Sequence, residues 1–103
     1  MSKDDDRLLK ALAEYMMILK RDPNDVRVQL RVAELSTRAG KNKEAIDSYL
    51  KVARIFTDQG FFLKALPVYK MVLHIDEGCI EAKEGLRSLY RQLGLEEDAK
   101  NVM

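Results

Sequence analysis

Apolar residues recur along the chain at intervals of three and four, the spacing that places them on one face of an α-helix. The first such stripe contains Leu8, Leu12, Tyr15 and Leu19, and similar stripes follow to the end of the sequence. No segment alternates polar and apolar residues over the length of a typical strand. The pattern predicts about six helices, covering roughly residues 5–21, 26–39, 43–58, 62–75, 80–93 and 96–103.

Proline and glycine separate these segments. The breaks contain Pro23, Gly40, Gly60, Gly78 and Gly94. Pro23 disfavours helical geometry in the residue before it, and Gly40 supplies the left-handed conformation that ends a helix. Pro67 lies inside the fourth segment and removes one backbone hydrogen bond, but the apolar pattern continues beyond it. Short connections make neighbouring helices antiparallel, so the expected fold is all-α.

The composition is that of one globular domain, predicted here to cover residues 1–103. Its 18 basic and 17 acidic residues are spread along the chain, and a net charge of +1 gives no field to attract nucleic acid. The apolar stretches are too often broken by charge to insert into a membrane. Three aspartates lie near the start of the sequence, where a secretion signal would have basic residues. We therefore expect a cytoplasmic protein.

The sequence offers little for catalysis or for cofactors. Cys79 and His74, each the only residue of its type, are too few ligands for a metal site. No serine or cysteine nucleophile is placed by sequence beside His74. The isolated glycines do not form a phosphate-binding loop. We predict no enzyme activity, no catalytic residues, no metal and no other cofactor.

One short pattern recurs along the chain. An alanine is followed four residues later by a large side chain in the pairs Ala11 and Tyr15, Ala45 and Tyr49, Ala65 and Tyr69, and Ala99 and Met103. The first two alanines are 34 residues apart and so are the last two, whereas the step between Ala45 and Ala65 is 20 residues. Gly40 and Gly60 repeat this shorter step. A fixed period indicates stacked units of similar structure.

A 34-residue period built from two helices resembles the tetratricopeptide repeat (TPR) family, in particular its bacterial arrays. Val32 and Ala33, and later Leu86 with Tyr90, match residues of the family's first helix, and residues 22–25 match its turn between repeats. The sequence departs from the family pattern in having no tryptophan, in Ser36 and Arg87, and in a turn without proline at 76–79. The resemblance implies a right-handed α-solenoid of antiparallel helix hairpins.

The 20-residue step is explained if two repeat registers share one helix, residues 43–58. In the first register this helix carries Ala45 and Tyr49 as a second helix. In the other it carries Val52, Ala53 and Phe56 as a first helix. Ala45 and Ala53 are then both expected in tight contacts with neighbouring helices. The alternative is that alanine and tyrosine recur by chance in amphipathic helices.

The resemblance also implies a concave groove lined by the first helix of each hairpin, which binds a peptide or helix of another protein. The residues that match this position are Arg27, Leu30, Glu34, Thr37, Arg38, Asp47, Leu50, Arg54, Glu84, Ser88 and Arg91. Their mixed charge suits modest polar contacts around an apolar strip formed by Leu30 and Leu50. Some members of the family bind a terminal carboxylate with lysines and asparagines at these positions. This sequence has neither residue type there. We predict an adaptor or scaffold with a protein partner.

Both ends of the sequence are incomplete as repeats. The first helix corresponds to the second half of a unit, and the last helix ends before its apolar face is complete. Unpaired apolar stripes tend to find partners. The chain is therefore expected to be part of a longer array, or to pack its terminal helices against a second copy. The latter alternative is a self-association module that forms a homodimer.

Overall fold

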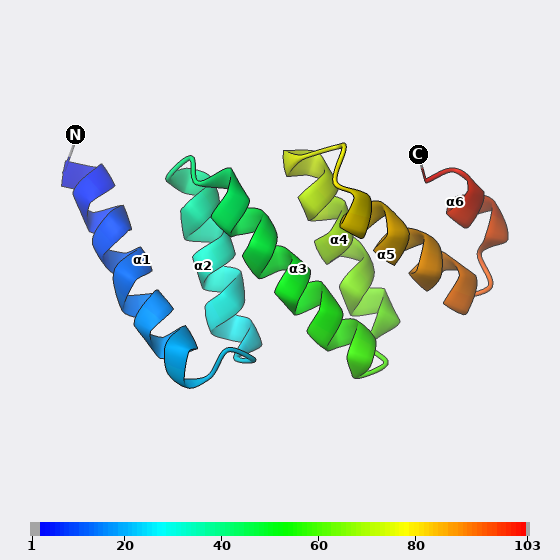
Figure 1. Ribbon diagram of the computed structural model, residues 1–103, viewed down its shortest axis with the longest axis horizontal. Helices are drawn as coiled ribbons and strands as arrows, with labels where there is room; N and C mark the ends of the chain where they lie inside the picture. Colours follow the sequence, from blue (N-terminus) through cyan, green and yellow to red (C-terminus); the bar gives the residue numbers. More distant parts are fainter. Residues whose placement is uncertain (1–2, 103) are drawn as a thin grey trace. The chain divides into compact units, whose positions relative to one another are not determined.

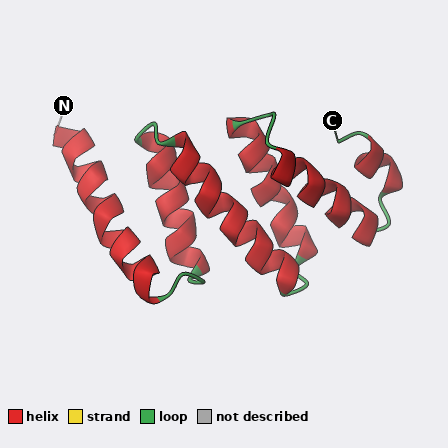
Figure 2. Ribbon diagram, in the orientation of Figure 1, coloured by secondary structure: helices red, strands yellow, loops and turns green. Residues whose placement is uncertain are grey.

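The computed structural model describes residues 3–102, and all regular structure in this range is helical (Figures 1 and 2). The all-α prediction is confirmed. The helices are α1 (Lys3–Arg21), α2 (Val26–Arg38), α3 (Asn42–Asp58), α4 (Phe62–Ile75), α5 (Ile80–Gln92) and α6 (Glu96–Lys100).

The chain divides into two compact units, Met1–Val52 and Ala53–Met103, so the boundary lies inside α3. The first part of α3 belongs to the first unit and contains Ala45, and the second part begins with Ala53. This is the helix that the sequence pattern predicts to be shared by two repeat registers. That residues 1–103 form a single domain stays a prediction.

In the first unit, α1 and α2 form an antiparallel hairpin (Figure 1). Its core contains Leu12, Val32 and Leu35, with flanking side chains from both helices packed around them. Asp25 caps α2 because its carboxylate accepts a hydrogen bond from the Val28 amide at 3.2 Å. The apolar stripes therefore form the interior of this hairpin, as their spacing predicts.

In the second unit, α4 and α5 are antiparallel, and α6 packs against α5 (Figure 1). The buried side chains include Tyr69 and Val72 on α4 and Leu86 and Leu89 on α5. A Cβ atom added to Gly85 would overlap the ring of Tyr69. The second unit therefore depends on a glycine at the point where the ring meets α5.

Most helix boundaries agree with the sequence-based limits within two residues. Gly40, Gly60 and Gly94 have φ of 73°, 82° and 76°, the left-handed conformation expected of glycines that end helices. Pro67 lies inside α4, which continues to Ile75.

The largest difference in the boundaries is near the C-terminus, where α6 ends at Lys100 and does not continue through Asn101 and Val102. The Nη2 atom of Arg87 donates a hydrogen bond to the Val102 carbonyl at 3.3 Å, so a side chain of α5 holds the segment that follows α6. Met103, the expected partner of Ala99 in the repeat pattern, lies outside the described residues.

Candidate functional site

The residues predicted to face a groove differ in how much surface they present. The exposed ones are Arg27, Glu34, Thr37, Arg38, Asp47, Arg54, Glu84, Ser88 and Arg91. Leu30 is half-buried. Leu50 is only 6% exposed and belongs to the core, so it offers a partner almost no surface. The apolar strip expected from Leu30 and Leu50 is thus reduced to Leu30.

Three of the predicted residues lie together on α5. Glu84, Ser88 and Arg91, with Arg87 and Gln92, line an open cavity of about 540 Å³, which we call the α5 hollow. The arginines donate hydrogen bonds, the glutamate accepts them, and the serine and glutamine side chains do both. This set suits the backbone and polar side chains of a peptide.

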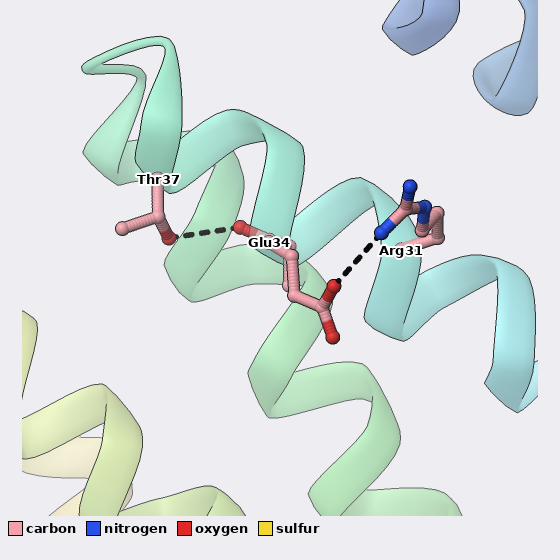
Figure 3. Close-up of polar contacts among 4 residues, drawn as sticks. Arg31, Glu34 and Thr37 are labelled. Carbon is pink, nitrogen blue, oxygen red and sulfur yellow. Dashed lines mark hydrogen bonds and ion pairs between the residues drawn. The ribbon is translucent and has the colours of Figure 1, made fainter.

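Two of the predicted residues on α2, Glu34 and Thr37, make polar contacts within their own unit (Figure 3). The Nη1 atom of Arg31 lies 3.2 Å from Oε2 of Glu34, and Arg31 is also hydrogen-bonded to Tyr15 of α1. Thr37 donates its hydroxyl proton to the Ala33 carbonyl at 2.8 Å. The Arg31–Glu34 pair is half-exposed, so solvent screens it and it contributes little to the stability of the fold. A partner can therefore replace this contact at little cost.

Arg54 is held by an ion pair within the second unit. Its Nη2 atom lies 2.7 Å from both carboxylate oxygens of Glu81 on α5. Both side chains are half-exposed. An acidic group on a partner therefore has to compete with Glu81 for this guanidinium.

A buried tyrosine pairs with a threonine in each unit, a feature that the sequence-based site prediction lacks. Tyr49 is hydrogen-bonded to Thr37 in the first unit, and Tyr69 to Thr57 in the second. Thr57 donates to the Ala53 carbonyl at 2.7 Å, as Thr37 does to that of Ala33. The 20-residue step in the sequence could have indicated these pairs, because both threonines and both acceptor alanines repeat at that interval.

Burial raises the pKa of Tyr49 above 10.0, its ordinary value, and the nearby charge of Glu34 raises it further. Burial likewise raises the pKa of Tyr69. Both units therefore favour the neutral phenol over the phenolate.

We expect the free energy of unfolding to fall as pH rises above about 10. A raised pKa in the folded state contributes stability that is present below the unfolded pKa and is lost as pH rises through the folded pKa. Urea titrations at pH 8 and pH 10.5, followed by circular dichroism, measure this loss. The double variant Tyr49→Phe/Tyr69→Phe should show a smaller loss, and an equal loss would assign the effect to other groups.

Asp47 lines a different cavity from the α5 hollow. With Met16, Leu19, Lys20, Val32, Glu44 and Ser48 it lines a cavity of about 320 Å³ in the first unit, which we call the acidic groove. Side chains of α1, α2 and α3 contribute to it, so no single helical stripe identifies it.

The described residues have neither a metal-binding cluster nor a membrane-spanning helix. They contain no group of three or more His, Cys, Asp and Glu side chains arranged to hold a metal ion. In the same part of the chain, none of the helices combines the length and apolar character needed to cross a membrane.

Comparison with known proteins gives a structural match. No protein-family model and no curated protein matches the sequence. The fold is similar to the crystal structure of MamA, a TPR-containing protein, with a TM-score of 0.53 and 19% sequence identity over 99% of this chain and 91% of that one. The chain thus has a TPR-like helical repeat fold, a fold that is typically non-catalytic.

Proposed function

We propose that this protein is a non-enzymatic interaction scaffold of the TPR family that binds a peptide or helix of a partner protein. The α5 hollow is the observation that carries the proposal, because it gathers Glu84, Ser88 and Arg91 around one open cavity. The TPR-like fold supports it, since stacked helix hairpins offer extended binding surfaces.

Binding in the α5 hollow depends on polar complementarity. The guanidinium of Arg91 binds a carboxylate or backbone carbonyls of the partner, while Glu84 accepts hydrogen bonds from backbone amides or a basic side chain. The first unit has exposed polar residues of its own on α2, including Arg27 and Arg38. The mixed charge favours a protein partner over nucleic acid, and the proposed location is the bacterial cytoplasm.

Selection from a phage-displayed library of random peptides tests this proposal. Enriched peptides should bind the wild-type protein and lose affinity about fivefold or more for Arg91→Glu, because the reversed charge repels the group that Arg91 binds. Arg7→Glu makes the same charge change on α1, outside the hollow, and should keep the affinity within about twofold. Failure to enrich any peptide, or equal losses in both variants, would contradict the proposal.

Self-association is a second candidate, favoured by the exposed apolar side chains of α1. Met16, Met17 and Ile18 are 48%, 65% and 44% exposed. Burying such side chains against a second copy would remove apolar surface from water. Light scattering across micromolar concentrations tests this candidate, and a molar mass that stays at the monomer value would exclude it.

A further inference from the structure

The acidic groove combines an apolar floor with charged and polar groups at its rim. Met16, Leu19 and Val32 supply the apolar surface, and Glu44 and Asp47 supply two carboxylates. Among the described residues, Lys20 is the one basic residue that lines it. Within the described part of the chain, no ion pair joins Lys20 to either carboxylate. The groove therefore has an excess negative charge that a ligand can neutralise.

Ser48 is an independent sign of a ligand. Its side chain lines the groove, and the residue is only 8% exposed. Its hydroxyl forms no hydrogen bond with another described residue. It is not a fully buried, unsatisfied atom, because it is open to the cavity. A nearly buried hydroxyl that faces a cavity without a partner is ready to bond a polar group of a ligand.

The size and lining of the groove limit what fits. Its volume of about 320 Å³ lies at the lower end of the roughly 300–1,000 Å³ typical of ligand sites. Met16 is flexible and polarisable, so the floor adapts to different aliphatic side chains. An apolar side chain with a positive charge nearby would satisfy the floor and the two carboxylates together.

We propose that the acidic groove binds a peptide segment in which one large aliphatic side chain is flanked, within about one helical turn, by lysine or arginine. The aliphatic side chain fills the space between Met16 and Val32. The basic side chain lies against Glu44 and Asp47, and Ser48 bonds a polar group of the peptide. This inference rests on the proposed function and adds a second binding site of defined specificity.

A synthetic peptide array tests the specificity. Each 15-residue peptide has a central leucine or alanine and, within four residues of it, a lysine, glutamine or glutamate. The remaining positions carry several different uncharged sequences. The wild-type protein should bind peptides with leucine and lysine about fivefold or more better than those with leucine and glutamate or alanine and lysine. Equal binding to the lysine and glutamate series, or no binding to the leucine and lysine series, would overturn the proposal.

Two adjacent methionines provide matched variants. Met16→Lys places a charge on the floor of the groove and should weaken binding of the best leucine and lysine peptide about fivefold or more in fluorescence anisotropy. Met17→Lys changes a more exposed neighbour that does not line the groove, and should alter the affinity less than about twofold. Equal effects of the two substitutions would place the peptide elsewhere.

Charge reversal at the rim completes the test. Glu44→Lys/Asp47→Lys should invert the preference from lysine-flanked to glutamate-flanked peptides, whereas Asp6→Lys/Glu14→Lys should leave it unchanged. An unchanged preference in the first variant would overturn the assignment of the two carboxylates. If phage selection still yields peptides that depend on Arg91, the proposed function survives the loss of this second site.

Discussion

Ala45→Leu and Ala53→Leu are each expected to lower the free energy of unfolding by about 1–3 kcal/mol. Both alanines are 0% exposed. The three extra carbon atoms of leucine cannot extend into solvent there and must displace packed neighbours. Ala45 lies in the first unit and Ala53 in the second, although both belong to α3. A loss of stability in both variants is expected because, in the shared-helix interpretation, α3 packs tightly against neighbouring helices in both repeat registers.

Urea titrations of the purified variants measure the losses. Lys43→Leu introduces the same side chain at an exposed position of α3 and should change the free energy of unfolding by no more than about 0.5 kcal/mol. A loss at only one of the two alanines would show that α3 is tightly packed in one register alone. The interpretation of α3 as a shared helix would then be wrong.

Gly85→Ala is expected to reduce the free energy of unfolding by about 1–2 kcal/mol, although alanine favours a helix more than glycine does. The added methyl group would overlap the ring of Tyr69. That ring is 6% exposed and hydrogen-bonded to Thr57, so it cannot move aside freely. The cost of overpacking therefore exceeds the gain of about 1 kcal/mol in helix propensity.

A double-mutant cycle identifies the cause. In the Tyr69→Leu background the ring is gone, so Gly85→Ala should become neutral or stabilising. Calorimetry or urea titration of the four proteins gives the coupling energy. If Gly85→Ala destabilises both backgrounds equally, the ring of Tyr69 is not what requires glycine at this position.

The helices were predictable because local chemistry specifies them. The apolar spacing, the Asp25 cap and the left-handed glycines act within a few residues of chain, and the observed helices follow them closely. Gly85 was not identified as a contact residue, because its role depends on where α4 places Tyr69. The end of α6 at Lys100 was not predicted either, because the sequence pattern does not show the hydrogen bond from the Arg87 side chain to the Val102 carbonyl.

The candidate sites were predictable to different degrees. Glu84, Ser88 and Arg91 are spaced three and four residues apart on one helix, so the period of α5 alone brings them together. The acidic groove combines side chains from three helices, and no local pattern joins Asp47 to Met16. Leu50 matches a groove position of the family by sequence, but its burial follows from packing that spacing alone does not describe.

The most direct test of the scaffold function is an NMR titration of ¹⁵N-labelled protein with a peptide selected from the phage library. If the α5 hollow binds the peptide, the amide signals of Glu84, Ser88 and Arg91 shift in a saturable way. These shifts should be lost in Arg91→Glu and retained in Arg7→Glu. Shifts that avoid α5, or that persist unchanged in Arg91→Glu, would contradict the claim that the α5 hollow binds a partner protein.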